Sequence, residues 1–459
     1  MSSIDETVDG DANEDRPPGP SGLPVVGNTL KFLRDPLTFH ERLGEYDEDV
    51  VRFDLLSNTA YLLKHPDYIE QVLVTDEATT FDRGEITQAA FREVVDGGLF
   101  VAEGDDWARQ RDLVRPAFYR QQLETYDDAI VEITREFVEE WDDGEEIHLS
   151  DEMTDLTLSV LAGTLLGVDL DGRGEPFSRA GKAVQSKFDT SSPSAYIPTW
   201  IPTPQNRRFK QAVTDVHELI DELMAERRNE PAGDDLLSLL LAASEGAADF
   251  GGDDGVGLTE DDIREHLITF LGAGHETTAV ALTYALYVLG SNPDIAETVR
   301  EELATVDGTP SAAEVRELPY LDKVVTETLR LYSPTYAIFR EPTEPVEIGG
   351  YEIPAGTNIT MSQYLVHRDE RWYDDPLTFR PERWTDEFRA ELPDYAYFPF
   401  GGGPRQCIGM RFATMEMKLA LATVLPRFDL EPVDDDPFDF QMVFSLQPGG
   451  PVPMRVHDR

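Results

Sequence analysis

The sequence predicts a mainly α-helical protein with small β-sheets, folded as a single domain. Most of the chain from Pro66 to about Leu241 has helical periodicity, and a very long helical segment follows Thr259. Short apolar runs typical of strands occur near 346–361 and close to the C-terminus. Loops interrupt the helical pattern near 82–106, 142–149 and 190–206. Because no internal repeat or clear linker divides these segments, we expect one continuous core.

The first 60 residues are predicted to contain a tail, an extended segment and a hairpin. Residues 1–15 are acidic and have few apolar anchors, so we expect a disordered tail followed by one domain over residues 16–459. The proline-rich stretch from Arg16 to Pro24 predicts a stiff, extended segment. Val50 to Leu56 and Ala60 to Leu63, separated by Ser57-Asn58-Thr59, predict a β-hairpin.

The composition restricts the partners and the setting. The chain has 459 residues, with 39 Lys and Arg against 90 Asp and Glu, which gives a net charge of −51. A surface this acidic argues against binding nucleic acids or anionic membranes. The excess is spread along the whole chain, and molar salt would screen the repulsion, so we expect a protein of a salt-adapted organism. With one cysteine, no apolar run of membrane-spanning length and no signal-like start, we expect a soluble cytoplasmic protein.

The long central helix contains an unusual segment. Thr259 and the acids after it form a good N-terminal cap, and Pro293 marks the end. Within the apolar stretch lies Ala273-Gly274-His275-Glu276-Thr277-Thr278. A kink with back-bonded Thr hydroxyls is one interpretation. A zinc protease motif fails because position 279 is Ala rather than a second His. The third interpretation is a site where another group approaches the helix closely at Gly274, and where a Thr hydroxyl and the acid would transfer protons.

The only cysteine, Cys407, lies in the stretch from Phe400 to Gly409, which has three glycines and a proline just before the sulfur. A lone cysteine is ordinarily a small buried hydrophobic residue. Here the tight loop and a predicted helix from Met410 to Leu425 place the sulfur at a helix N-terminus, and Arg405 adds a cation. These features favour a thiolate, which suits either a nucleophile or the axial ligand of a haem.

The motif Phe400-x-x-Gly403-x-Arg405-x-Cys407-x-Gly409 resembles the haem-binding signature of the cytochrome P450 family. The resemblance extends over nearly the whole chain from about Pro17. Residues 273–278 resemble the oxygen-activating segment of the family's central helix. Glu327-Thr328-Leu329-Arg330 resembles its Glu-x-x-Arg pair, with Arg383 as the third member of the network. The same spacing at Glu132/Arg135 and Glu297/Arg300 suits surface ion pairs better.

This resemblance implies a single P450-type domain, with the long helix over a haem b and the cysteine loop on the opposite face. Cys407 would be the thiolate ligand of the iron. Ala273 and Gly274 would border the oxygen site, Thr277 would hold water, and Glu276 would help deliver protons. The propionates would be held by Arg405, Trp107 and Arg111, with Arg340 as a fourth candidate. The implied activity is insertion of one oxygen atom of O2 into a hydrophobic substrate.

The resemblance also suggests substrate contacts and an electron donor. The substrate contacts are apolar or aromatic and suit a fatty acid, isoprenoid or carotenoid: Phe91, Leu99, Phe100, Tyr196, Trp200, Phe270, Ala273, Thr335 to Ile338, and Phe444. No flavin- or iron–sulfur-binding segment follows Cys407, so a separate ferredoxin-type donor with its reductase is expected. Its dock would be the basic island of Arg109, Arg111, Arg115 and Arg120. A peroxide-driven peroxygenase and a non-enzymatic haem or gas sensor remain as alternatives.

Overall fold

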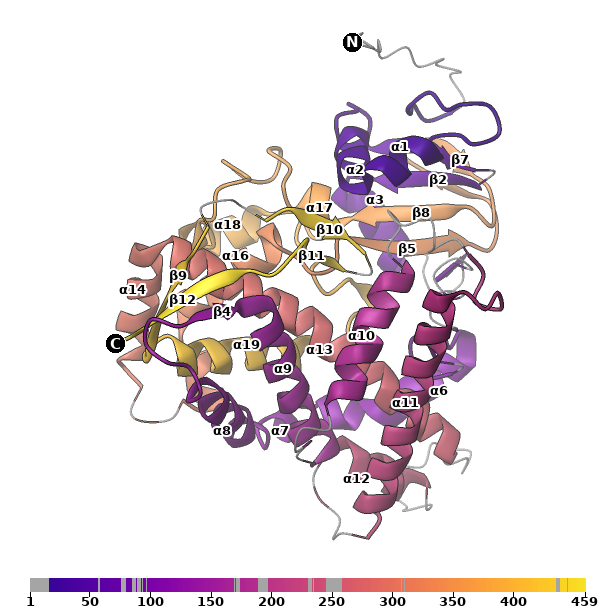
Figure 1. Cartoon of the computed structure of the whole chain (residues 1–459). Coiled ribbons are helices and arrows are strands. Elements are labelled where there is room, and N and C mark those ends of the chain that lie inside the picture. The colour runs from indigo at the N-terminus through magenta and orange to yellow at the C-terminus, as the bar shows by residue number, and fades with distance from the viewer. Residues whose placement is uncertain are drawn as a thin grey trace.

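The computed structural model describes residues 16–459 except 57, 76–79, 85–87, 89–91, 93, 96, 169, 171–173, 189–196, 230–232, 234, 245–257, 307, 309, 435–437 and 444. The tail predicted at 1–15 lies outside these residues. The described chain has the predicted architecture, a large helical body and a smaller part rich in strands (Figure 1). None of its helices is both long and apolar enough to cross a bilayer.

The part rich in strands is built on a mixed five-stranded sheet in the order β1-β2-β8-β5-β3. The predicted hairpin is confirmed as an antiparallel pair, although β2 begins at Asn58 because that residue pairs with Leu55. β8 runs parallel to β2, which joins residues far apart in the sequence. Helices α1 and α2 lie beside this sheet in Figure 1. The bounds here are α1 Thr29–Arg34, α2 Pro36–Gly44, β1 Val50–Leu55, β2 Asn58–Leu63, α3 Pro66–Glu70, β3 Phe81–Asp82, β5 Ala337–Pro342, β6 Val346–Ile348, β7 Tyr351–Ile353 and β8 Asn358–Ser362.

The helical body surrounds α13, Glu260–Ser291. The predicted cap is confirmed: Thr259 and Asp262 exchange side-chain and backbone hydrogen bonds in a capping box. The same cluster of buried apolar residues contains side chains of α8, α9, α13, α16 and α19. The bounds are α6 Gly104–Val114, α7 Arg120–Leu123, α8 Asp127–Val138, α9 Leu149–Leu161, α10 Glu175–Phe188, α11 Pro204–Arg227, α12 Leu236–Ser244, α14 Pro293–Leu303, α15 Ala312–Arg316, α16 Pro319–Leu331, α17 Gln363–Val366, α18 Asp386–Glu391 and α19 Met410–Val424.

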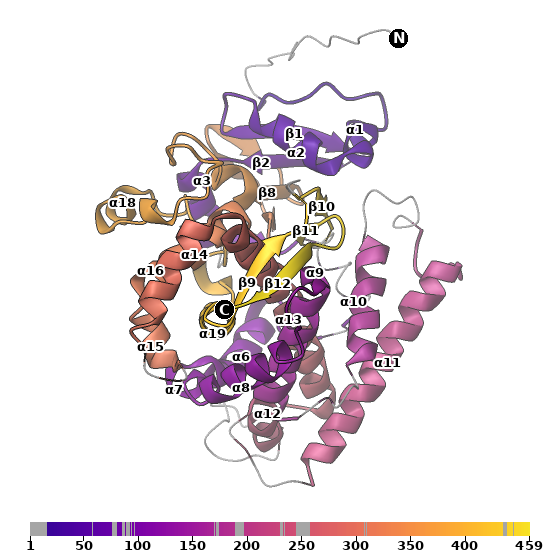
Figure 2. The ribbon, with the colours of Figure 1, turned by 60° about the vertical axis from the view of Figure 1, so that its left-hand side comes forward.

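Two features of the arrangement matter for the site. Helices α10 and α11 lie side by side along one flank of the helical body (Figure 2). The C-terminal strands form a hairpin, β10 Phe440–Met442 with β11 Leu446–Pro448, and a second sheet in the order β4-β12-β9. In that sheet β12, Pro453–Asp458, lies between β4, Glu146–His148, and β9, Phe428–Pro432.

Candidate active site

The cysteine loop is a tight turn whose shape depends on its glycines. The amide of Cys407 donates to the carbonyl of Phe400 at 3.0 Å, which closes the loop just before α19 begins at Met410. Gly403 has a φ of +65°, in the left-handed region that favours glycine. A Cβ at Gly402 would lie only 2.2 Å from the ring of Tyr395, so the aromatic ring and this backbone can pack together only around a glycine.

The environment of Cys407 corrects one expectation. Burial raises the pKa of the thiol above its usual range, although hydrogen bonds from the amides of Gly409 and Met410 and the charge of Arg111 oppose this shift. The predicted helix N-terminus therefore acts in the predicted direction, but desolvation outweighs it in the protein alone. The side chain is nevertheless accessible. An accessible sulfur can meet a bound cation such as a haem iron, and such a cation would favour the thiolate.

Three of the predicted propionate-binding residues come together beside the loop. The guanidinium carbons of Arg405 and Arg111 lie 4.6 and 5.5 Å from the ring centre of Trp107. Arg111 also donates to the carbonyl of Gln406 at 2.8 Å. The indole Nε1 of Trp107 is buried and has no hydrogen-bond partner among the described residues. A buried donor beside two cations is suited to a carboxylate ligand.

Two further contacts of this region were not expected from the sequence. Arg405 is paired with Glu103, the residue before α6, and also donates to the carbonyl of Ala102 at 3.3 Å. Ile338 on β5 contacts the cysteine loop, since a Cβ at Gly401 would lie 3.1 Å from its Cδ1. Arg340, the fourth propionate candidate, is buried on the same strand and donates to the carbonyl of Phe339.

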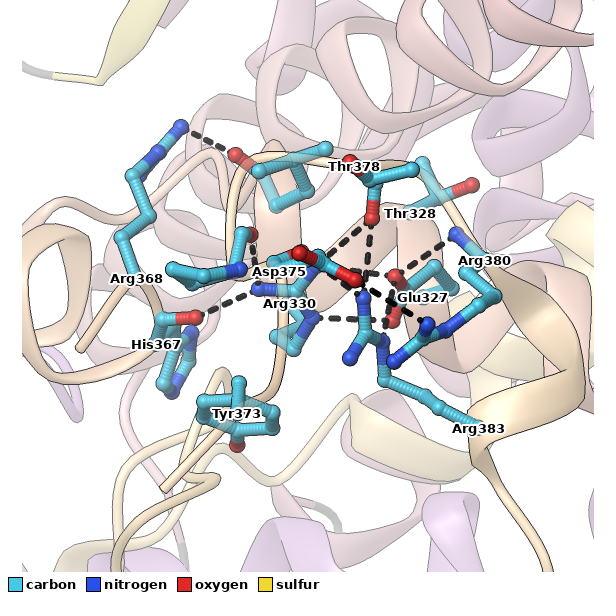
Figure 3. A network of polar contacts seen from close by, with 12 residues as sticks. Glu327, Thr328, Arg330, His367, Arg368, Tyr373, Asp375, Thr378, Arg380 and Arg383 are labelled. Carbon is cyan, nitrogen blue, oxygen red and sulfur yellow. Dashed lines mark hydrogen bonds and ion pairs between the residues drawn. The ribbon is translucent and has the colours of Figure 1, made fainter. Parts of the chain in front are cut away.

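The predicted network around Glu327 is present and more extensive than the motif suggests (Figure 3). Glu327 and Arg330 are fully buried and form a bidentate pair with both distances at 2.8 Å. Arg383 reaches the same carboxylate at 2.9 Å. Burial would by itself raise the pKa of Glu327, but the hydrogen bonds and charges of the two arginines lower it overall. The carboxylate is therefore ionised, as a buried pair of this geometry requires.

The network is connected to the cysteine loop through a residue that the sequence motifs did not indicate, His367. Its carbonyl accepts from Arg330 at 2.6 Å, and its ring Nε2 accepts from the amide of Phe398 at 3.0 Å. Burial lowers the pKa of His367 well below its usual range, so the ring is neutral and can accept. The carbonyl of Phe398 in turn accepts from the amide of Gly401. Glu327 thus supports the loop through one chain of hydrogen bonds.

The central segment of α13 combines features of two interpretations. The helix is continuous from Glu260 to Ser291, so no break occurs, but Thr277 does bond back to the carbonyl of Ala273 at 2.8 Å. Glu276 accepts from Ser445 and Gln447 at 2.8 and 2.6 Å. A neighbouring helix lies close to Gly274, because a Cβ there would lie 3.1 Å from Leu161 on α9, and the approach of a ligand at this glycine stays a prediction. Among the described residues, no group of three or more His, Cys, Asp and Glu side chains could hold a metal ion.

A cavity of about 110 Å³ borders the same segment of α13 and lies against α10 and α11. Of the predicted substrate contacts, Phe100 and Ala273 line it. Leu99 is buried in the main core, Phe270 packs against Phe118 and His266, and Thr335 and Ile338 are half-buried. Trp200 is 76% exposed, so its assignment to the cavity is not supported by this conformation. Phe91, Tyr196 and Phe444 lie outside the described residues.

The remaining cavity wall was missed by the sequence reasoning. It is mostly aliphatic and aromatic and includes Val94, Phe177, Val184, Val213 and Ile268. Four lining residues carry polar side chains, namely His217, Thr269, His275 and Glu276. Among the described residues that line it there is no lysine or arginine. Helical periodicity in α10 and α11 was visible, but a residue that faces a cavity has the same spacing as one that faces the core.

Comparison with known proteins places these features in a family. The cytochrome P450 profile matches residues 17–452. A cyclooctat-9-en-7-ol 5-monooxygenase of Streptomyces melanosporofaciens is 33% identical over 90% of this chain and 89% of its own. A pentalenene oxygenase of Streptomyces avermitilis is 32% identical over 91% of this chain and 92% of its own. A retinoic acid-bound cyanobacterial CYP120A1 superimposes with a TM-score of 0.84, at 25% identity over 96% of this chain and 99% of that chain. The chain belongs to the cytochrome P450 family and is a haem-dependent monooxygenase.

Proposed function

We propose that this enzyme inserts one atom of O2 into a neutral, isoprenoid-type substrate, using electrons from a separate redox protein. The cavity carries this proposal. Its wall is largely hydrocarbon, and its described lining offers no cation for the carboxylate of a fatty acid, which would instead meet Glu276. Isoprenoid oxidation is also named for relatives that are about one-third identical, including the pentalenene oxygenase.

The cofactor assignment rests on the chemistry of the residues present. Cys407 would bind the iron of haem b, while Trp107, Arg111 and Arg405 would hold a propionate, with Arg340 as a further candidate. Glu103 neutralises Arg405 in the protein alone, and a propionate would take over that pairing. Bound in this way, the haem supplies oxygen binding and activation. The spectrum of the reduced carbon monoxide complex tests the ligand, because Cys407→Ser should abolish the thiolate band.

Thr277 would hold a water molecule, and Glu276 would help to deliver protons. The Thr277 hydroxyl donates its only hydrogen to the carbonyl of Ala273, which leaves its oxygen lone pairs free to accept from a water molecule. Thr277→Ala should therefore keep the haem but divert electrons to peroxide. Equal product yield per electron in wild type and variant would contradict this role. Efficient turnover with peroxide and none with O2 and electrons would instead favour the peroxygenase alternative.

The substrate class is tested by the spectral shift that binding causes at the haem. We expect a cyclic terpene hydrocarbon or alcohol to shift the absorption spectrum at lower concentration than a fatty acid of equal carbon number. The methyl ester of that fatty acid is a matched control, because it removes the charge and keeps the chain. Tighter binding of the free acid than of its ester would overturn the proposal for a neutral substrate.

We also propose that an acidic ferredoxin-type donor, supplied by its reductase, docks beside the cysteine loop. A surface hollow of about 370 Å³ there is lined by Trp107, Arg111, Arg115, Gly403 and Pro404, among others. Within the basic island, Arg109 and Arg120 are paired with Asp106 and Glu124, whereas the guanidinium of Arg115 lies over the ring of Tyr119. Arg115→Glu should slow reduction by the donor more than Arg120→Glu does. Unchanged rates in both variants would contradict docking here.

A high-salt cytoplasm is the setting that we propose for the enzyme. The net charge of −51 supports it, because repulsion among carboxylates weakens as the Debye length falls to about 3 Å in molar salt. The thermal midpoint of unfolding should rise between 0.1 and 2 M potassium chloride. A midpoint that is flat or falls over that range would contradict adaptation to salt.

A further inference from the structure

The carboxylate of Glu276 is held by the C-terminal hairpin, from a part of the chain that no motif associates with α13. Its Oε1 accepts from the hydroxyl of Ser445 at 2.8 Å and from the amide nitrogen of Gln447 at 2.6 Å. The same amide nitrogen also donates to the Ser445 hydroxyl at 2.8 Å, which closes a triangle. Two donors on one oxygen suit an ionised carboxylate, which can only accept.

The other carboxylate oxygen is left for the cavity. Oε2 of Glu276 has no hydrogen-bond partner among the described residues, and Glu276 borders the cavity. It is not among the buried polar atoms that lack partners, so it is accessible. The bonds to Oε1 therefore restrict the rotamer of a residue that lines the cavity, and Oε2 stays accessible.

The hairpin segment that supplies the two donors is itself rigidly anchored. Between them lies Leu446, whose side chain is fully buried. Its amide donates to the carbonyl of Pro334 at 2.7 Å, and its carbonyl accepts from the hydroxyl of Tyr284 at 2.9 Å. Tyr284 is on α13 two turns after Glu276, so the hairpin is tied to the helix at both points. Donors fixed in this way lose little entropy when they bind the carboxylate.

We propose that Ser445 and Gln447 are positioning residues that hold Glu276 in the orientation from which its free oxygen exchanges protons with the cavity. This rests on the proposed role of Glu276. One turnover converts RH, O2, two protons and two electrons into ROH and water, with both electrons from the redox donor. For each of the two protons, the carboxylate of Glu276 takes up a proton from solvent at Oε2 and passes it on to the cavity, so its own protonation state is restored after each cycle.

The first test measures the contact itself, without turnover. Gln447→Met removes the amide donor at similar length, and Gln441→Met is a matched control, because Gln441 is exposed and directly opposite in the hairpin register. In the haem-loaded protein, Gln447→Met should raise the unfolding equilibrium constant about tenfold or more, the size of a charge-assisted hydrogen bond. In a Glu276→Ala background the same change should have less than about a twofold effect. Equal effects in both backgrounds would overturn the proposal.

The second test separates positioning from general support of the hairpin. Gln447→Met and Ser445→Ala should lower the product formed per electron pair with O2, leave KM unchanged and leave peroxide-driven turnover unchanged. Tyr284→Phe removes one anchor of the hairpin but leaves both donors to Glu276, so it should lower the product yield per electron less than either donor variant does. If Tyr284→Phe lowers that yield equally, or if peroxide-driven turnover falls in parallel, the residues only support the fold.

Glu276→Gln distinguishes failure of this inference from failure of the proposed function. If that variant keeps the full product yield per electron, Glu276 has no part in proton supply, and both proposals about it fail. If Glu276→Gln lowers the yield while Gln447→Met and Ser445→Ala do not, only the positioning role fails.

Discussion

Glu327→Gln tests whether the buried network or the simple i,i+3 spacing stabilises this protein. The carboxylate accepts five hydrogen bonds: Oε1 takes three, from Arg330, Arg383 and the amide of Arg380, and Oε2 takes two, from Arg330 and Trp384. Glutamine has the same shape, but one of its two terminal atoms is an NH2 donor. Even in the better orientation, the two donors at Oε2 lose their acceptor.

The expected magnitude follows from that geometry. The substitution leaves two unpaired donors and removes the negative charge of Glu327 that faces Arg330 and Arg383, while both guanidiniums stay buried. Breaking a buried ion pair on one side costs about 3–5 kcal/mol. A typical domain is stable by only about 5–15 kcal/mol, so most of the margin would be lost.

The assay is urea unfolding of the haem-loaded protein, with the carbon monoxide spectrum recorded in parallel to report the cysteine ligand. Glu132→Gln is the matched control, since Glu132 and Arg135 have the same spacing and form a pair with both side chains about half exposed. Exposed pairs of this kind contribute little, so its midpoint should stay near wild type. A loss of stability in Glu327→Gln no larger than in Glu132→Gln would refute the reasoning.

Three further substitutions probe buried groups. Burial lowers the pKa of His266 to about 4, so the folded state does not take up the proton that the unfolded state gains below pH 6.5, and the wild type loses stability as the pH falls. The free energy of unfolding of His266→Leu should therefore rise by about 2 kcal/mol relative to wild type between pH 7.5 and pH 5, as measured by urea unfolding at the two pH values. Gly402→Ala, which forces a Cβ against Tyr395, should lower the thermal midpoint, whereas Gly450→Ala, with open space around it, should not. Burial raises the pKa of Glu416, so this residue destabilises the folded state increasingly as the pH rises above the ordinary glutamate range. Glu416→Gln should therefore be more stable than wild type at pH 8, and that difference should disappear at pH 4.

The sequence was most informative where one local pattern determines the structure. The cap at Thr259 and the hairpin near residues 50–63 depend on neighbouring residues, and both are present. The pairing of Glu327 with Arg330 follows from helical spacing, and its specificity came from the family resemblance rather than from spacing alone. Helix α19 begins at Met410 as predicted, directly after the cysteine loop.

The sequence was least informative where two distant segments meet. His367 is linked to both Arg330 and Phe398, and nothing in its own neighbourhood indicates either contact. The donors to Glu276 lie in a hairpin about 170 residues later, at Ser445 and Gln447. Gly274 shows a related limit: a glycine indicates that something lies close, here Leu161 of α9, but it does not indicate whether a ligand also approaches.

The pairing of β12 with β4 has a consequence for synthesis of the protein. Met454 lies opposite Ile147, so about 300 residues must be translated before this sheet can close. At 5–20 residues per second this takes roughly 15–60 s. Throughout that time β4 has an unpaired edge, directly before the apolar helix α9. A nascent chain in this condition exposes a surface that chaperones bind, and its yield in a foreign host should depend on translation speed as well as on the stability of the finished fold.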